Sequence, residues 1–131
     1  MRNRIGRRFW QLGGNLMKIR EIAELLDAEV LCCPENLDKE VYSACGSDMM
    51  SDVLAYVKDQ AVLITGLTNP QVIRTAEMMD MVCIVFVRNK QPTAEMLTLA
   101  AEHGMVVLAT PKRMYEACGM LYAAGLYRSG D

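Results

Sequence analysis

Polar and cationic residues follow three apolar segments of this sequence, and together they could bind an anion. The apolar segments are residues 61–65, 81–87 and 105–109. Helices that begin just after such segments direct backbone N–H groups outward, and these groups attract phosphate. The sequence therefore indicates an anion site, suited to a nucleotide or a phosphorylated metabolite, formed by Thr65, Gly66, Thr68, Asn69, Arg88, Lys90, Thr110, Lys112 and Arg113.

The same residues also have a purely structural interpretation. Asn69 precedes Pro70 and Thr110 precedes Pro111. Each pair combines a capping side chain with a proline suited to the first helical turn. Thr68, Asn69 and Thr110 would then be ordinary helix caps, and the nearby cations would simply be solvated. At the level of the sequence both interpretations stay open.

The usual sequence patterns of catalytic and cofactor sites are missing. The chain has no G-x-x-x-x-G-K-[ST] loop, no G-x-G-x-x-G after an apolar segment and no G-x-S-x-G turn. Its single histidine, His103, precedes Gly104 where a helix is expected to end, and there it can complement the helix dipole. One histidine without clustered ligands does not favour a zinc site. We therefore predict no catalytic residues, no metal and no cofactor.

The cysteines favour a reducing compartment. There are five of them, an odd number, and Cys32 and Cys33 are adjacent, which is not the C-x-x-C spacing of a chelating pair. Cys45, Cys83 and Cys118 fall in expected helices and strands, where a free cysteine acts as a small hydrophobic residue. We expect reduced thiols and a cytoplasmic protein; a redox or metal role is the alternative. No apolar run is long enough to cross a bilayer.

The candidate site must be positioned by the apolar segments themselves. Met81 to Val87 is an unbroken run of seven apolar residues, whereas a half-exposed strand would alternate, so this run predicts a strand covered on both faces. Strands near residues 61, 81 and 105, each followed by a helix, indicate βαβαβα order and a parallel sheet. Two short segments, 28–32 and 41–45, are expected to join it. The predicted fold is a single α/β domain whose mainly parallel sheet of about five strands has helices on both faces, with ligands at the carboxyl ends of the strands.

The first sixteen residues differ in charge from the remainder. They carry four arginines and no acid, although the whole chain has a net charge of −2. We expect a basic leader that is disordered or lies upstream of a true start at Met17, because codons for Gly13-Gly14-Asn15 can form a ribosome-binding sequence. A basic nucleic-acid arm or a targeting peptide is the alternative. The acidic remainder favours neither nucleic acid nor membrane as a partner. We expect the domain over residues 17–126 and a tail over 127–131.

Three stretches resemble the DRTGG domain family. They are KIREIAELLDAEVL at 18–31, VLIT at 62–65 and GMVVLATP at 104–111. The resemblance implies an α/β domain similar to the N-terminal domain of bacterial HPr kinase/phosphorylase. Such domains stand alone or are fused to CBS or ATP-dependent enzyme domains, and their role is regulatory.

The chain departs from this family at the residues that give it its name. Thr68-Asn69 stands where the family has Asp-Arg, and Val87-Arg88-Asn89 stands where it has Thr-Gly-Gly. Glycines permit a close approach of the backbone to a ligand. We therefore expect any ligand site of the family to be altered or lost in this chain.

Three functions are consistent with these observations. The leading prediction is a non-catalytic regulatory or protein-interaction module that forms a homodimer. The alternatives are a small-molecule sensor and a small enzyme, both using the strand-end site. Tyr115, Tyr122 and Leu126 are expected on one strip of the last helix, offset from its core face. Tyrosines suit interfaces, so this strip is the predicted dimer or partner contact, unless it only covers the edge of the core.

Overall fold

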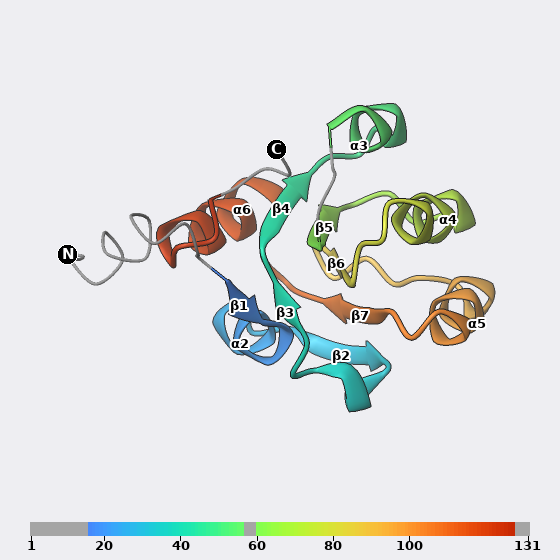
Figure 1. Cartoon of the computed structure of the whole chain (residues 1–131), viewed down its shortest axis with the longest axis horizontal. Helices are drawn as coiled ribbons and strands as arrows, with labels where there is room; N and C mark the ends of the chain where they lie inside the picture. Colours follow the sequence, from blue (N-terminus) through green and yellow to red (C-terminus); the bar gives the residue numbers. More distant parts are fainter. Residues whose placement is uncertain (1–15, 57–59, 128–131) are drawn as a thin grey trace.

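Strand β6 (Cys83–Phe86) lies at the centre of a five-stranded sheet with the order β2-β7-β6-β5-β4 (Figure 1). The computed structural model describes residues 16–56 and 60–127. The other strands are β2 (Glu29–Cys32), β4 (Ser43–Gly46), β5 (Ala61–Thr65) and β7 (Val106–Ala109). Strands β4 to β7 are parallel, and β2 pairs antiparallel with β7 at one edge. The predicted single α/β domain with a mainly parallel sheet is confirmed.

Two layers of helices cover this sheet, as the apolar runs predict. Helices α3 (Met50–Tyr56), α4 (Pro70–Met78) and α5 (Ala94–Glu102) lie on one face, and α2 (Ile19–Leu25) and α6 (Met114–Ala123) lie on the other (Figure 1). Every residue of β5, β6 and β7 is buried. The unbroken run of apolar residues is thus explained by burial on both faces of the sheet. Cys83 is fully buried, and this burial raises the pKa of its thiol.

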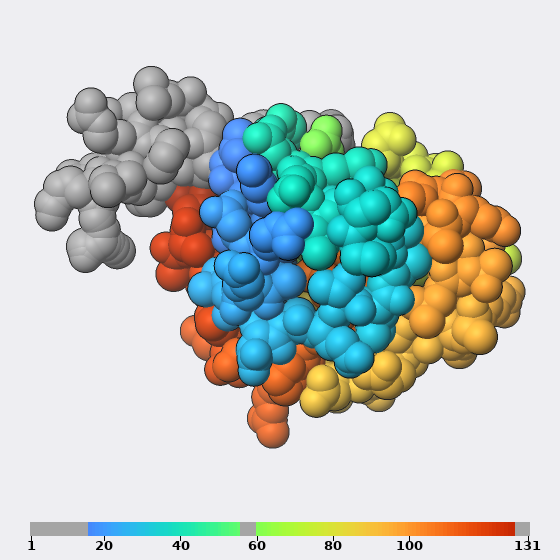
Figure 2. Space-filling model, turned by 90° about the horizontal axis from the view of Figure 1, so that it is seen from below, coloured from blue at the N-terminus to red at the C-terminus, as the bar shows by residue number. Residues whose placement is uncertain are grey.

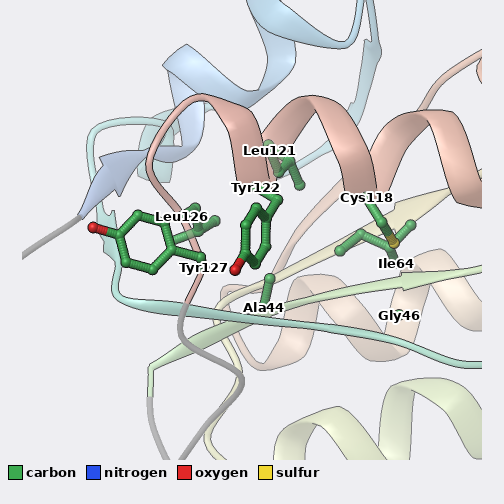
Figure 3. A pocket seen from close by; sticks show the side chains of 8 residues that line it. All are labelled: Ala44, Gly46, Ile64, Cys118, Leu121, Tyr122, Leu126 and Tyr127. Carbon is green, nitrogen blue, oxygen red and sulfur yellow. The ribbon is translucent and has the colours of Figure 1, made fainter. Parts of the chain in front are cut away.

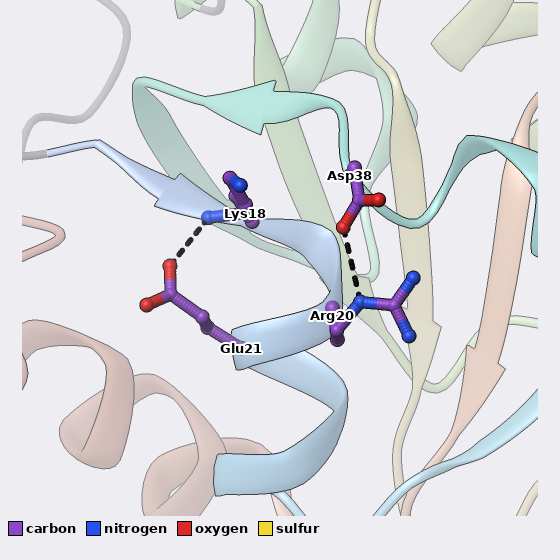
Figure 4. Close-up of polar contacts among 4 residues, drawn as sticks. All are labelled: Lys18, Arg20, Glu21 and Asp38. Atoms are coloured by element: carbon purple, nitrogen blue, oxygen red, sulfur yellow. Dashed lines mark hydrogen bonds and ion pairs between the residues drawn. The ribbon is translucent and has the colours of Figure 1, made fainter.

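A small two-stranded ribbon and a polar network complete the side that carries α2. Strand β1 (Met17–Lys18) pairs antiparallel with β3 (Glu40–Val41). At the start of α2, the Glu21 carboxylate accepts a hydrogen bond of 2.8 Å from the backbone N–H of Lys18 (Figure 4). Arg20 Nε donates to Asp38 Oδ1 at 3.0 Å, which ties α2 to the loop before β3. This hydrogen bond and the charge of Arg20 lower the pKa of the Asp38 carboxyl.

The helix starts differ from the sequence prediction in two places. From the sequence, Pro92 is expected to open a helix that ends at His103. Helix α5 instead begins at Ala94, because the Thr93 side chain accepts a hydrogen bond from the Met96 N–H and caps the helix. Helix α6 begins at Met114, so Thr110 is not its cap. The prediction is right for α4, where Asn69 caps the helix and a proline occupies the first turn.

The predicted leader and tail fall mostly outside the described residues. Residues 1–15, 57–59 and 128–131 are not described. Val57, which the i+7 spacing from Met50 predicts on one face of a helix, therefore lies outside the described residues. Leu16 is exposed. Tyr127, expected at the start of the tail, is described, and its ring centroid lies 5.5 Å from that of Tyr122.

Candidate functional site

The carboxyl ends of the parallel strands meet at one edge of the sheet, which we call the rim. Thr65, Phe86 and Ala109 are register partners at the ends of β5, β6 and β7. The loops that follow these strands, and the loop after β4, therefore lie side by side. The rim comprises residues 47–49, 66–69, 87–91 and 110–113, so it contains the three polar loops that the sequence indicates as an anion site.

An aspartate that sequence reasoning missed lies at one end of the rim, in the loop after the edge strand β4. Asp48 Oδ1 accepts hydrogen bonds from Thr65 Oγ1 at 3.0 Å and from the Gly66 N–H at 2.7 Å. From the sequence, Ser47 or Asp48 is expected to cap the helix that follows. In the structure Ser47 Oγ accepts a hydrogen bond from the N–H of Met49, the residue before α3. Asp48 instead bonds across to β5, a contact for which its local sequence holds no signal. It places a carboxylate among the expected cations.

Gly66 lets the guanidinium of Arg88 lie against the backbone. A Cβ atom at Gly66 would be 2.9 Å from Arg88 Nη2 and 3.7 Å from Asp48 Oδ1. Any larger side chain at position 66 would therefore have to displace the guanidinium. The predicted residues Gly66 and Arg88 are brought together, and Asp48 lies beside them.

Arg88 and Asn89 form a left-handed turn just after β6. Their φ angles are 56° and 52°, and the Lys90 N–H donates to the Val87 carbonyl at 3.1 Å. Left-handed backbone costs a residue with a side chain roughly 1–2 kcal/mol, and asparagine tolerates it better than most. From the resemblance described above, these two positions are expected to stand in place of two glycines. The chain therefore holds two adjacent left-handed residues here without any glycine.

The backbone amides of this turn are already hydrogen-bonded within the protein. The Arg88 N–H donates to the Lys112 carbonyl and the Asn89 N–H to the Thr110 carbonyl, both at 2.8 Å. The loop after β6 is thereby joined to the loop after β7. An anion at the rim must accordingly be held by side chains rather than by these two amides.

Four cationic residues belong to these two joined loops. Arg88, Lys90 and Arg113 are exposed, and Lys112 is half-buried. Lys112 Nζ lies 3.9 Å from Glu116 Oε2, one helical turn away in α6. Carboxylates lie at this edge as well: Asp48 is near Arg88, Glu116 is near Lys112, and Glu29 is the register partner of Ala109 at the end of β7, so the charge of the rim is mixed.

Three of the predicted site residues already make side-chain hydrogen bonds within the protein. Thr110 is fully buried, and its Oγ1 donates to the Leu26 carbonyl at 2.6 Å and accepts from the Lys112 N–H at 3.2 Å. Asn69 Oδ1 accepts from the Gln71 N–H at 2.9 Å as the cap of α4. Thr65 is buried, and its Oγ1 donates to Asp48 Oδ1. Thr68 is half-buried in the loop after β5.

Comparison with known proteins gives the family of this chain. A family model of the DRTGG domain matches residues 21–124. The chain belongs to the DRTGG domain family. No curated protein matches it.

This DRTGG domain also resembles a solved regulatory structure. That structure contains the CBS and DRTGG domains of the regulatory region of Clostridium perfringens pyrophosphatase, complexed with the activator diadenosine tetraphosphate. The TM-score is 0.68 at 14% sequence identity, and the match covers 87% of this chain. It covers 51% of the other chain, so this DRTGG domain spans about half the length of that region. At this identity the similarity shows the shared fold, and neither comparison gives a catalytic family.

The strip expected on the last helix of the DRTGG domain is only partly exposed. Tyr115 is 91% exposed and Tyr122 is 64% exposed, but Leu126 is 2% exposed, so its place in an exposed strip is a wrong expectation. Helix α6 ends at Ala123, and Gly125 with a φ of 114° turns the chain back, so helical spacing no longer applies at Leu126. Leu126 therefore packs into the core of its own domain.

A shallow apolar pocket lies beside these residues, between the edge strand β4 and α6 (Figure 3). Its volume is about 230 Å³. The lining residues are Ala44, Gly46, Ile64, Cys118, Leu121, Tyr122, Leu126 and Tyr127. The pocket lies on the α6 side of the sheet and is separate from the cations of the rim.

Two further observations concern metals and membranes. Within residues 16–56 and 60–127, no three His, Cys, Asp or Glu side chains are grouped so that they could hold a metal ion. In the same part of the chain, no helix is both long and apolar enough to span a bilayer.

Proposed function

We propose that this DRTGG domain is a non-catalytic regulatory module that binds an anionic ligand at the rim. The observation that carries this proposal is Arg88, which is held in a left-handed conformation with its guanidinium against Gly66. Strained backbone of this kind persists where the surroundings hold it in place, and it is concentrated at ligand sites and switches. A guanidinium is also the side chain best suited to hold phosphate, because its donors form a planar fork.

The mixed charge of the rim favours a nucleotide over a simple phosphate. Arg88, Lys112 and Arg113 supply cations for phosphate groups, whereas Asp48 would repel a phosphate and accept hydrogen bonds from a sugar hydroxyl or a base amine. A nucleotide presents both kinds of group. The pyrophosphatase regulatory region, which shares this fold, is complexed with a dinucleotide activator, and this supports the same ligand class here.

The substitution Arg88→Gly tests the proposal because it removes the guanidinium while relieving the backbone. Relief of left-handed strain is worth roughly 1–2 kcal/mol, and the entropy of a new glycine offsets about 0.5–1 kcal/mol of it. We expect unchanged or slightly higher stability together with at least a tenfold loss of affinity. Titration calorimetry with ATP, diadenosine tetraphosphate and inorganic phosphate measures the affinity, and thermal unfolding measures the stability.

Asp80→Gly is the matched control for this experiment. Asp80 also has a φ of 56°, but it follows α4 at the opposite end of β6 from the rim. Its replacement should change stability in the same way and leave affinity unaltered. Equal affinity of Arg88→Gly and the wild type, or no binding of these ligands by the wild type, would contradict the proposed rim site.

A second candidate function, protein interaction through α6, rests on the exposure of its tyrosines. Tyr115 and Tyr122 lie two turns apart on one face of α6 and are 91% and 64% exposed. Tyrosine buries a large apolar area while its hydroxyl remains in water, and two-fold dimers are the commonest assembly. On this view the module is a homodimer whose partner copy covers α6.

Tyr115→Glu is expected to convert such a dimer to a monomer. Tyr115 suits the test better than Tyr122, because the ring of Tyr122 also packs on Tyr127 within the domain. Light scattering at micromolar concentration should give twice the chain mass for the wild type and the single chain mass for the variant. Thr98→Glu, on the exposed side of α5, should stay dimeric. A monomeric wild type would rule out the homodimer.

A further inference from the structure

Cys32 and Cys33 bring two thiols together at the end of β2. Their Sγ atoms are 3.5 Å apart, both residues are free cysteines, and they are 9% and 7% exposed. Successive side chains of a strand normally point to opposite faces. Here Cys33 has φ 58° and ψ 52°, in the left-handed region, so its side chain is turned back beside that of Cys32. Adjacent cysteines are not a chelating spacing in a regular strand, but this turn makes them a close pair.

The separation of the two sulfurs suits a shared ligand atom better than a bond between them. Two thiolates on one tetrahedral centre, with bonds of about 2.3 Å, lie roughly 3.7 Å apart. A disulfide has Cα atoms at least about 4.4 Å apart, whereas the Cα atoms of adjacent trans residues are only about 3.8 Å apart. A bridge through a single soft atom therefore requires little movement, and a direct disulfide requires a strained backbone.

The pKa of the Cys33 thiol bears on which kind of soft atom the pair can bind. Burial, and then the hydrogen bond with Cys32, raise the pKa of the Cys33 thiol to about 12. A bare cation would have to displace the proton of this poorly acidic thiol. A trivalent arsenic compound with an oxygen ligand carries its own proton acceptor, because the oxygen leaves as water. Arsenic(III) is also soft, as thiolate sites prefer.

We propose that Cys32 and Cys33 form a vicinal-dithiol site for trivalent arsenic compounds. With phenylarsine oxide, two As–S bonds form, the arsenic–oxygen bond is broken, and the two thiol protons leave with that oxygen as one water molecule. Arsenic and sulfur keep their oxidation states, so no oxidant is required. The arsenic centre then carries two sulfurs and its phenyl group.

The surroundings of the pair couple this site to the fold. Cys32 Sγ lies 3.8 Å from the Leu97 carbonyl of α5, and the short 3₁₀ turn that follows (Pro34–Asn36) is anchored by the Asn36 amide, which donates to the Gly104 carbonyl at 2.8 Å. The residues around this turn form part of the surface seen in Figure 2, in the cyan region. A ligand that bridges the sulfurs would hold the end of β2 in its observed conformation.

Phenylarsine oxide binding to the full chain tests the proposal. We expect one equivalent to bind, to raise the thermal midpoint, as for any ligand that binds the folded state, and to be released by excess dithiothreitol but not by an equal concentration of a monothiol. Cys32→Ala and Cys33→Gly should each weaken binding at least 100-fold, because a single thiol cannot chelate. Glycine is used at position 33 because it accepts the positive φ. Cys118→Ala should bind like the wild type.

Peptide mapping of the wild-type adduct gives an answer that does not depend on the variants folding. Proteolysis and mass spectrometry should find the arsenic on a peptide that contains both Cys32 and Cys33. An adduct that bridges Cys45 and Cys118 instead, equal binding by the single-cysteine variants, or no adduct at all would overturn the proposal.

Discussion

Replacing Val85 with aspartate is expected to prevent folding. Val85 is fully buried in β6, the central strand, and its register partners Ile64 and Leu108 are buried as well. An ionised carboxylate without a partner in such a place costs many kcal/mol, and even its neutral form loses hydrogen bonds to water. Domains are stable by only about 5–15 kcal/mol in total. Circular dichroism and thermal unfolding of the purified variant should show no cooperative transition.

Met78→Asp provides the control for this substitution. It introduces the same charge, but Met78 is 65% exposed on α4, so the carboxylate stays in water and the domain should fold. A soluble Val85→Asp variant with a cooperative transition would contradict the burial of the central strand between two helical layers.

Gly46→Ala is expected to lower the free energy of unfolding by about 1–3 kcal/mol, as overpacking of a core does. Two side chains of helix α6 lie against β4 at this glycine. A Cβ atom at Gly46 would lie 2.6 Å from Cys118 Sγ and 3.4 Å from Met114 Sδ. Both sulfurs belong to α6, so the helix has to shift away from the sheet to admit one methyl group. Urea unfolding measures the difference in stability.

Gly119→Ala makes the same chemical change where space is free. No heavy atom that a new Cβ would meet lies within 4 Å of position 119, which is exposed within α6. Alanine is favoured over glycine in a helix by roughly 0.5–1 kcal/mol, so this variant should gain stability. If Gly46→Ala were as stable as Gly119→Ala, α6 would not be seated on β4 as closely as described.

The sequence predicts the parallel part of the sheet well because β5, β6 and β7 are buried apolar runs and each is followed by a helix. It does not predict the direction of β2. Residues Glu29–Cys32 read as a short strand in either orientation, and only the pairing of Glu29 with Ala109 makes the strand antiparallel. The start of α6 is also not predicted, because it depends on a contact between distant segments. The hydroxyl of Thr110 donates to the Leu26 carbonyl, at the end of α2, and does not cap α6.

The sequence predicts which loops form the candidate site, but not which of their side chains face it. The rule that ligands bind at the carboxyl ends of parallel strands points to three loops, which the structure does bring together at one edge of the sheet. It cannot tell that Thr110 faces inward or that Asp48 reaches across to Gly66, because both depend on contacts between segments far apart in the chain. The sequence also does not predict the left-handed turn at Arg88, because neither Arg88 nor Asn89 is the glycine that normally marks such backbone.

The antiparallel pairing of β2 with β7 has a consequence for synthesis on the ribosome. Strand β2 is the first strand of the sheet to be made, and β7, its partner in the sheet, is the last. Ribosomes add about 5–20 residues each second, so the nascent β2 remains unpaired for several seconds after it leaves the exit tunnel. Its complement emerges only when nearly all of the domain has been translated. This edge of the sheet can therefore form only after β7 has emerged, and until then β2 is an unpaired strand that a chaperone could bind.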